Sequence, residues 1–271
     1  MEKQKIRLTR EKETLLVPLY SKAVESQGPH PIIVDPKAEE ILQRIEYDFD
    51  ELRVPRQTLI TLAMRAKKLD SYVRDYLDRS ENPVLLHLGC GLDSRVLRVG
   101  FDKGGWYDID YPDVIELRRR FYDETSYYHM IPSSVTERAW LDQVVAGNGR
   151  ACIVAEGLLM YLHEEEVRRL FLDLQRRLPS SEIVFDAYSR LTAKGANRHP
   201  SIKKTGARIH WGIDDARQIE AWGYGIKLLD EWYFTDSADI SSLGFRDRLL
   251  FKTMGMFGMA KRAHRILRFR L

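Results

Sequence analysis

Short apolar runs alternate with longer amphipathic stretches from Asn82 onward, and this alternation restricts the fold more than any other feature of the chain. The runs are rich in β-branched and aromatic residues, whereas the stretches between them have helical spacing. Strands that alternate with helices form βαβ units and a parallel sheet. The predicted strands are residues 84–88, 106–109, 127–131, 151–156 and 182–186. We therefore predict an α/β fold with a doubly wound sheet.

Helices are predicted between these strands and before them. Residues 164–178 place Val167, Leu170 and Leu174 on one apolar stripe, and Pro179 ends the helix. The other predicted helices are residues 113–122 within the sheet region and residues 38–45, 57–69 and 69–77 ahead of it. We expect the helices ahead of the sheet to cover it.

The last part of the chain has a different pattern. Residues 227–234 and 265–271 both have strand character, and the second segment contains arginines at alternate positions. A strand with arginines on one face explains that segment better than a helix lying on a membrane. We predict an antiparallel terminal hairpin.

Composition narrows the class of protein. The longest apolar runs, 84–92 and 151–162, contain polar residues and are shorter than the ~18 residues of a membrane span. The charged N-terminus has no apolar run followed by a cleavage site, so it is not a secretory signal. We expect a cytoplasmic protein without a membrane partner. Cys90 and Cys152 lie in apolar runs, which favours buried thiols over a disulfide or a zinc site.

The sharpest local pattern is VLLHLGCGLDSR at residues 84–95, an apolar strand followed by Gly89 and Gly91 and by the start of a helix. Glycines let the backbone approach a ligand, and a helix N-terminus presents free N–H groups. Asp110 ends the next strand, where a carboxylate can accept hydrogen bonds from both hydroxyls of a ribose. The pattern predicts a cofactor that carries a nucleoside.

Two classes of cofactor use this geometry. A dinucleotide fold favours a third glycine three positions after the second, and this chain has Ser94 there. S-adenosylmethionine has no phosphate, so it needs only the glycine turn, an acid for its ribose and a polar hold on its amino-acid end. We therefore favour S-adenosylmethionine over a dinucleotide.

Three motifs in order then carry a resemblance to a known family. They are LGCGLDSRVLR at 88–98, WYDIDYPDVIELRR at 106–119 and EGLLMYL at 156–162. With LYSKAVES at 19–26, TLAMRAKKLD at 61–70 and HWGIDD at 210–215, they make the whole chain resemble the leucine carboxyl methyltransferase family, in particular its polyketide-type O-methyltransferase branch.

The resemblance implies a class I methyltransferase fold that binds S-adenosylmethionine and releases S-adenosylhomocysteine. Such a fold is Rossmann-like, with a seven-stranded, mostly parallel sheet and an antiparallel last strand. We expect a single domain built from four parts: a helical cover (1–80), a cofactor-binding core (81–189), a cap insertion (190–226) and the terminal hairpin (227–271).

The resemblance also assigns roles to individual residues. Gly89 and Gly91 would line the cofactor, and Asp110 would hold its ribose. Asp93, beside this turn, is a further candidate for contact with the cofactor. Arg65, assisted by Lys22, would hold the methionine carboxylate by a charge-assisted hydrogen bond. Glu156 would lie near the ammonium or sulfonium group, with Tyr161 behind it as a candidate catalytic residue.

A purely structural role could also account for several of these residues. Arg65 shares its helix with Lys67 and Lys68, and such a charge run is usually a solvated face. Asp93 is equally well explained as a helix N-cap, and Tyr161 as a core residue. Glu156 differs, because a carboxylate inside an apolar run is costly to bury without a cationic partner.

The chain departs from the family near the expected adenine site. The family usually has an acidic residue after the third strand, and this chain has Ser133 and Ser134 there. A hydroxyl contacts the adenine amine more weakly than a carboxylate. Ser134 is therefore a weak candidate, with Glu137 as the alternative.

The acceptor is predicted to be a small anionic molecule. A carboxylate acceptor is already ionised at neutral pH and needs no base, whereas a hydroxyl needs one, for which His210, His199 and Tyr188 are the candidates. Between residues 187 and 213 the chain carries six basic side chains and no acidic one: Arg190, Lys194, Arg198, Lys203, Lys204 and Arg208. We expect no nucleic-acid partner, because aromatic residues do not alternate with these cations.

Two alternative functions stay open. The chain could methylate the C-terminal carboxylate of a protein, which requires an open groove instead of a closed pocket. It could also be a cofactor-binding module without activity, although Arg65, Gly89 and Glu156 are all present. The sequence leaves the acceptor undetermined and leaves open whether the chain is a homo-oligomer.

Overall fold

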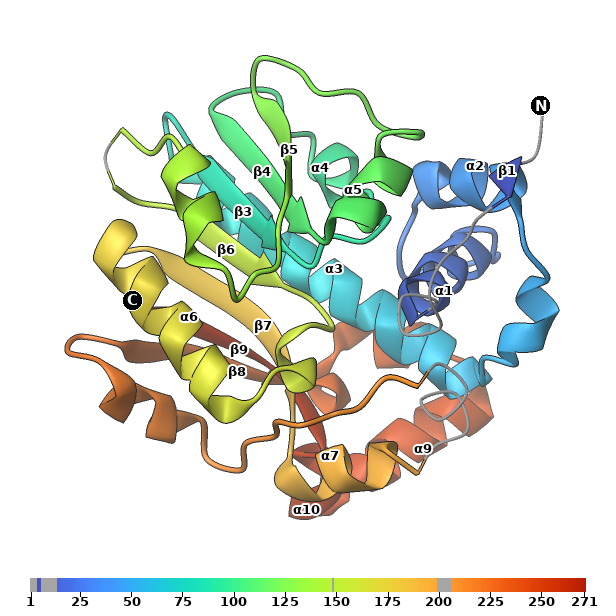
Figure 1. Cartoon of the computed structure of the whole chain (residues 1–271). Helices are drawn as coiled ribbons and strands as arrows, with labels where there is room; N and C mark the ends of the chain where they lie inside the picture. Colours follow the sequence, from blue (N-terminus) through green and yellow to red (C-terminus); the bar gives the residue numbers. More distant parts are fainter. Residues whose placement is uncertain (1–3, 6–13, 148, 199–205) are drawn as a thin grey trace.

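A seven-stranded sheet with helices on both faces forms the centre of the molecule (Figure 1). The computed structural model describes residues 4–5, 14–147, 149–198 and 206–271. The strands of the sheet are β3 (Val84–Leu88), β4 (Gly105–Asp110), β5 (Tyr128–Pro132), β6 (Cys152–Ala155), β7 (Glu182–Tyr188), β8 (Lys227–Tyr233) and β9 (His264–Arg270). Their order is β5-β4-β3-β6-β7-β9-β8, and a separate two-stranded parallel pair joins β1 (Gln4–Lys5) to β2 (Ile45–Glu46).

Strand β9 runs antiparallel within the seven-stranded sheet. It is opposite in direction to both of its neighbours, β7 and β8, whereas the other pairs described in this sheet are parallel. The predicted α/β fold with an antiparallel last strand is confirmed, and so is the pairing of the last two strands. The two strands are not joined by a tight turn, because the connection forms η6 (Phe234–Asp236), η7 (Ala238–Ser242), α9 (Phe245–Met256) and α10 (Gly258–Lys261).

The helices agree with the periodicity, with shifts at their ends. The stretches 57–69 and 69–77 form one continuous helix, α3 (Arg56–Asp78), since no proline or glycine interrupts them. The helix expected at 113–122 is α5 (Pro112–Arg118) and is shorter than predicted. The remaining α-helices not yet named are α1 (Leu16–Ser26), α2 (Pro36–Arg44), α4 (Arg95–Arg98), α6 (Glu164–Arg177) and α7 (Arg190–Ala196). The remaining 3-10 turns are η2 (Phe49–Leu52), η3 (Arg138–Gln143), η4 (Leu159–Tyr161) and η5 (Ala216–Trp222).

Two apolar layers hold the helices against the sheet. Successive side chains of a strand point to opposite faces, so Leu85 and Cys152 pack in the layer of α3, while Leu86 and Ile153 pack in the layer of α6. Both cysteines are free and buried, as the sequence predicted. Among the described residues, no helix is both long enough and apolar enough to cross a membrane.

The carboxyl ends of β3, β4, β6 and β7 lie at one edge of the sheet, because these strands are parallel. Helices α1 and α3 pack against each other, and residues of both face this edge. Any side chain that follows one of these strands is therefore brought close to the N-terminal helices. This edge is where ligands bind in open α/β sheets.

Candidate active site

A cavity of about 740 Å³ opens at the carboxyl edge of the sheet. Its walls come from α1, α3, the glycine turn after β3, the ends of β4 and β6, η4 and α7. Ten of the residues that the sequence singled out for the cofactor or for catalysis line it: Lys22, Arg65, Gly89, Gly91, Asp93, Asp110, Ser134, Glu156, Tyr161 and His210. Side chains separated by up to about two hundred positions in the sequence thus surround one space.

The glycine turn at the end of β3 has the predicted geometry. Gly89 and Gly91 have φ angles of +63° and +49°, which residues other than glycine rarely adopt. The backbone N–H of Gly91 donates to Asp110 Oδ2 at 2.8 Å, and that of Tyr111 donates to Asp110 Oδ1 at 2.8 Å. Burial raises the pKa of Asp110, and the two backbone N–H groups only partly oppose this. Each oxygen of the Asp110 carboxylate accepts one of these backbone hydrogen bonds and can accept a further one from a molecule in the cavity.

Glu156 lies between two buried guanidinium groups. Arg65 Nε is 3.0 Å from Glu156 Oε1, and Arg95 Nη2 donates to Glu156 Oε2. Burial by itself would raise the pKa of Glu156, but the charges of Arg65 and Arg95 lower it to about 2. The cationic partner predicted for this carboxylate is present, and the interpretation of Arg65 as part of a solvated face is wrong, since Arg65 is only 5% exposed.

Arg65 is held by a second carboxylate that the sequence analysis did not single out. Arg65 Nη1 is 3.0 Å from Asp186 Oδ2, and Asp186 Oδ1 accepts a hydrogen bond from Gly157 N at 2.6 Å. His264 Nε2 is 2.9 Å from Asp186 Oδ2. Burial opposes ionisation of Asp186, but Arg65 and His264 outweigh it and lower its pKa. The position of Asp186 in the sequence could have identified it as a site residue, because Asp186 lies near the end of β7 just as Asp110 ends β4.

Lys22 and Asp93 form an ion pair at the cavity wall. Lys22 Nζ lies 2.7 Å from Asp93 Oδ1, and Lys22 is only 2% exposed. The interpretation of Asp93 as an N-cap is wrong: Ser94 occupies the N-cap position of α4, and Asp93 pairs with Arg98 at 2.6 Å and with Arg95 at 3.2 Å. Burial opposes ionisation, but these cations hold the pKa of Asp93 well below its usual range.

Two serines border the cavity beside Asp110. Ser133 N donates to the backbone oxygen of Asp110 at 2.9 Å, and the Ser134 hydroxyl lies 2.8 Å from the Thr136 hydroxyl. Glu137 is exposed and lines a different crevice, together with Trp140. The wall near Asp110 thus presents hydroxyls, and the Ser133 hydroxyl in turn lies 3.4 Å from Glu137 Oε2.

The other end of the cavity is largely apolar and aromatic. Its lining includes Thr58, Leu62, Met160, Tyr161, Tyr188, Thr192, Ala196 and Ile209. Burial raises the pKa values of Tyr161 and Tyr188, so both phenols stay protonated at neutral pH. They can donate hydrogen bonds to a bound molecule but are poor bases.

His210 and one arginine lie at the rim of the cavity. His210 is exposed, and its ring centroid is 4.1 Å from that of His163. Partial burial and the neighbouring His163 lower the pKa of His210. Of the six basic side chains predicted to face an acceptor, Arg208 lines the cavity, whereas Arg190, Lys194 and Arg198 are exposed outside it. Lys203, Lys204 and the candidate base His199 lie outside the described residues.

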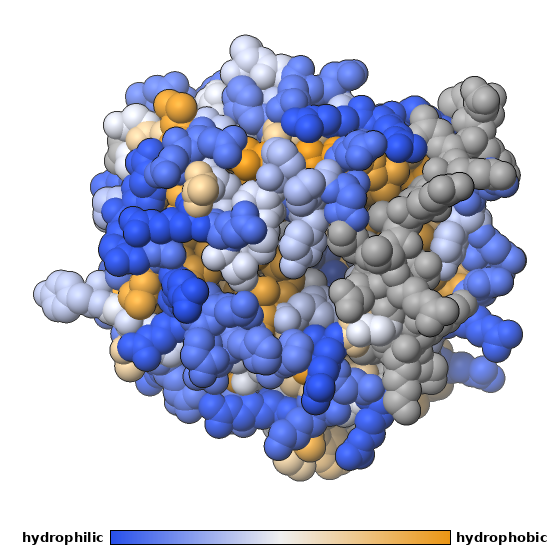
Figure 2. All heavy atoms as spheres, viewed as in Figure 1, coloured by the Kyte–Doolittle hydropathy of each residue, from blue (hydrophilic) through white to orange (hydrophobic). Residues whose placement is uncertain are grey.

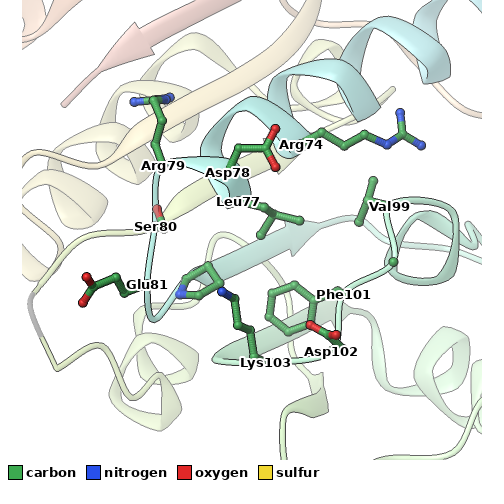
Figure 3. A pocket seen from close by; sticks show the side chains of 12 residues that line it. Arg74, Leu77, Asp78, Arg79, Ser80, Glu81, Val99, Phe101, Asp102 and Lys103 are labelled. Carbon is green, nitrogen blue, oxygen red and sulfur yellow. The ribbon is translucent and has the colours of Figure 1, made fainter.

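A second cavity lies at the opposite end of β3. It is bordered by the C-terminal end of α3 and by the loop before β4, and its volume is about 580 Å³. In Figure 3 the side chains of Arg74 and Arg79 extend outward from it, while Phe101 and Leu77 form its apolar part. None of the residues predicted for the cofactor borders this cavity, so it is not the candidate active site.

The residues of the first cavity fit the cofactor that the sequence suggests. Asp110 is a buried carboxylate whose hydrogen bonds come from two backbone N–H groups, which leaves acceptor positions for a pair of hydroxyls. At Gly89 an added Cβ would lie 2.9 Å from Leu158 Cδ1, so a larger residue would have to displace the Leu158 side chain. No phosphate site is needed, and the amino-acid end of the molecule would meet Lys22, Arg65 and Glu156.

Comparisons with known proteins point in the same direction. A family model described as leucine carboxyl methyltransferase matches residues 16–175. The chain is 38% identical over 265 residues to the tetracenomycin polyketide synthesis O-methyltransferase TcmP of Streptomyces glaucescens, covering 97% of this chain and 98% of that one. It is 29% identical to the S-adenosyl-L-methionine-dependent methyltransferase dpfgK of Gibberella zeae, covering 97% and 95% of the two chains.

Among solved structures, a DUF574 family protein from Streptomyces avermitilis superposes with a TM-score of 0.61 at 13% identity. The alignment covers 95% of this chain and 96% of that one. At this low identity the likeness concerns the fold alone.

Proposed function

The chain belongs to the leucine carboxyl methyltransferase family and is an S-adenosylmethionine-dependent O-methyltransferase, and we propose that it methylates a carboxylate of a small, anionic, polyketide-like molecule. The observation that carries the proposal is the continuity of one cavity from the glycine turn to an apolar, aromatic end with Arg208 at its rim. Its volume lies within the ~300–1,000 Å³ range of small-molecule sites.

The proposal assigns the nucleoside to the glycine turn. Asp110 would accept hydrogen bonds from both ribose hydroxyls, and the backbone at Gly89 and Gly91 would lie against the cofactor. Ser134 would contact the adenine, where a neutral hydroxyl replaces the carboxylate usual in the family. Its position on the cavity wall next to Asp110 supports this assignment.

Lys22, Arg65, Asp93 and Glu156 would hold the amino-acid end of the cofactor. Arg65 is fixed on two sides by Glu156 and Asp186, so its guanidinium is held at one place without a ligand. Such preorganisation lowers the entropy cost of binding a carboxylate. Glu156 stays ionised because of Arg65 and Arg95, and it can therefore balance the positive charge of the ammonium group.

S-adenosylmethionine supplies a methyl group on a positively charged sulfur, and transfer proceeds by in-line displacement. The O–C bond to the acceptor forms while the C–S bond breaks, and S-adenosylhomocysteine leaves. The protein has to align acceptor oxygen, methyl carbon and sulfur, which can supply ~7–11 kcal/mol of barrier lowering. The apolar wall at Leu62 and Ile209 and the hydroxyl of Tyr161 would orient the acceptor.

A carboxylate fits this site better than a hydroxyl. With a reference pKa near 4, a carboxylate is ionised at neutral pH and needs no base. Tyr161 and Tyr188 stay protonated, so they are suited to donate hydrogen bonds to an anionic oxygen. His210 would act as a catalytic base only for a hydroxyl acceptor, and its exposed place at the rim makes this the less favoured role.

The test uses matched aromatic acceptors. Purified protein is incubated with S-adenosylmethionine and anthraquinone-2-carboxylic acid, its carboxamide or a hydroxyanthraquinone, and products are analysed by mass spectrometry. The proposal expects a methyl ester of the acid that mild alkali hydrolyses. An alkali-stable methyl ether from the hydroxyanthraquinone, with no ester from the acid, would overturn the choice of carboxylate.

A further inference from the structure

The most unusual surface of the molecule lies on α9 and α10. Large apolar side chains are strongly exposed there: Phe245 (71%), Leu249 (54%), Leu250 (39%), Met256 (80%), Phe257 (61%) and Met259 (81%). In Figure 2 a few apolar atoms are visible at the lower margin, where Figure 1 shows both α7 and α10. Single exposed apolar residues are ordinary, but a contiguous group marks an interaction surface.

Three of the four exposed apolar residues of α9 form one stripe along the helix. At about 100° per residue, Phe245, Leu249 and Met256 fall within about 40° of one another. Phe251 and Asp247 are buried and lie on the opposite side, where they fix the helix to the body of the protein. The stripe therefore points away from the core, and Phe257 and Met259, which follow it in the chain, are also exposed.

The exposed charges around the stripe are cationic. Arg246, Lys252 and Arg262 are exposed, and none of them pairs with an acidic side chain among the described residues. From residue 245 to residue 262 the one acidic side chain is Asp247, which is buried and pairs with Arg56 at 2.8 Å. We refer to the exposed apolar residues of α9 and α10 with these three cations as the α9 surface.

We propose that the α9 surface docks the enzyme onto an anionic lipid bilayer. Protruding Phe, Leu and Met side chains insert into a bilayer interface, and neighbouring Lys and Arg side chains bind its anionic head groups. The contact depends on these side chains and not on α9 as an amphipathic helix, since its overall amphipathicity is low. A bilayer accepts side chains that protrude from a convex surface, whereas a protein partner needs a complementary groove. This inference replaces the expectation, based on the apolar runs alone, that the protein has no membrane partner.

A second copy of the chain fits the α9 surface less well. In a twofold dimer the same patch occurs on both sides, so the cations of one copy would face those of the other. No unpaired acidic side chain among the described residues of α9 and α10 could compensate for this repulsion. An anionic surface neutralises the same charges, which is why the bilayer is the favoured occupant.

The contact also has a defined place relative to the cavity. Asp247 of α9 pairs with Arg56, the first residue of α3, and the neighbouring Pro55 and Thr58 line the cavity. Docking would therefore hold one wall of the cavity next to the lipid interface. Resting on the proposed function, this arrangement suits an apolar acceptor that partitions into the bilayer.

The test is co-sedimentation with vesicles. The full chain is mixed with vesicles of phosphatidylcholine alone or of an equal mixture of phosphatidylcholine and phosphatidylglycerol, at low and at high salt. We expect binding to the anionic vesicles that high salt weakens. The double variant Phe257→Ser/Met259→Ser should lower the partition coefficient by about tenfold or more, and Lys252→Glu should lower it as well. Tyr224→Ser, at a fully exposed aromatic residue outside the α9 surface, is the matched control and should bind like the wild type.

Several outcomes would overturn the proposal. They are equal binding to both kinds of vesicle, no binding to either, or wild-type binding by the double variant. Light scattering that shows a dimer which the double variant converts to a monomer would assign the surface to a second copy. Calorimetric binding of S-adenosylhomocysteine checks that each variant is folded, and because it involves the cavity alone, it separates failure of docking from failure of the proposed function.

Discussion

Arg65 Nε lies 3.0 Å from Glu156 Oε1, and this contact joins the N-terminal helix α3 to the end of strand β6. The two residues are 91 positions apart in the chain, and both border the cavity. Since Arg65 also contacts Asp186 and Glu156 also contacts Arg95, the pair is the centre of a buried ionic network. The helical cover is therefore part of the candidate site and not only a shield over the sheet.

Removing the charge of Glu156 is expected to destabilise the fold. In Glu156→Gln the guanidinium groups of Arg65 and Arg95 lose a shared buried counterion, and breaking such a pair costs about 3–5 kcal/mol. Urea unfolding should show a midpoint well below that of the wild type. Glu164→Gln, at an exposed position in the first turn of α6, is the control and should unfold like the wild type. An unchanged midpoint in Glu156→Gln would mean that the network does not stabilise the protein.

Asp110→Asn is expected to weaken binding of S-adenosylhomocysteine by about tenfold or more. The amide keeps the shape of the side chain but loses one acceptor oxygen and the negative charge, and charge-assisted hydrogen bonds are about twice as strong as neutral ones. Isothermal titration calorimetry measures the effect. Asp102→Asn in the second cavity is the control (Figure 3), and equal affinity in both variants would remove Asp110 from the site.

The pH dependence of binding follows from the same carboxylate. Burial raises the pKa of Asp110 above 3.8, and ribose binding requires the ionised form. Affinity should therefore fall as the pH drops, and the fall should begin at a higher pH than an ordinary aspartate would give. Glu156, with a pKa of about 2, stays ionised over this range and does not contribute. Titrations across the acidic range should show the loss in the wild type and a flatter profile in Asp110→Asn, whereas a fall centred at or below 3.8 would contradict the raised pKa.

Much of the fold followed from the sequence because parallel strands have local patterns. Apolar, β-rich residues between predicted helices were enough to predict strands at 84–88 and 182–186, and the structure has strands there. The connection between β8 and β9 was not predicted, since the low amphipathicity of α9 hides its two faces. The sequence does not distinguish Phe251, which is buried, from Phe245, which is exposed, because the difference depends on which face of α9 packs against the rest of the protein.

The candidate site was predictable where a residue ends a strand or follows one. Asp110, Glu156 and the glycine turn could be found in this way. Arg95 and Asp186 were missed, because their importance lies in contacts over 61 and 121 positions with Glu156 and Arg65. Spacing along the chain gives no measure of such contacts, and only the packing of α3 against the sheet edge creates them.

Gly89→Ala separates backbone strain from crowding in the glycine turn. Alanine at φ +63° costs about 1–2 kcal/mol, and its Cβ would also lie 2.9 Å from Leu158 Cδ1. Gly100→Ala is the matched control, since Gly100 has a φ of +68° and nothing within 4 Å of an added Cβ. Thermal unfolding should show a larger loss of stability for Gly89→Ala than for Gly100→Ala. When Leu158→Ala is added to each glycine variant, the difference between the two losses should become smaller. Equal losses of stability in the two glycine variants would show that the Leu158 side chain moves aside without a free-energy cost.

Arg208→Glu tests the anionic character of the acceptor. Among the described members of the basic run, Arg208 alone lines the cavity, so its charge is the one that an acceptor anion would meet. The variant should raise the KM for an aromatic carboxylic acid by about tenfold, because an attraction becomes a repulsion near the rim, while the KM for S-adenosylmethionine stays unchanged. Arg198→Glu, exposed outside the cavity, carries the same change of charge and should leave both constants as they are. If both variants raise the acceptor KM equally, the effect comes from the overall electrostatic field of the basic residues and not from a contact with Arg208. If neither variant raises it, the acceptor does not place its charge at this rim.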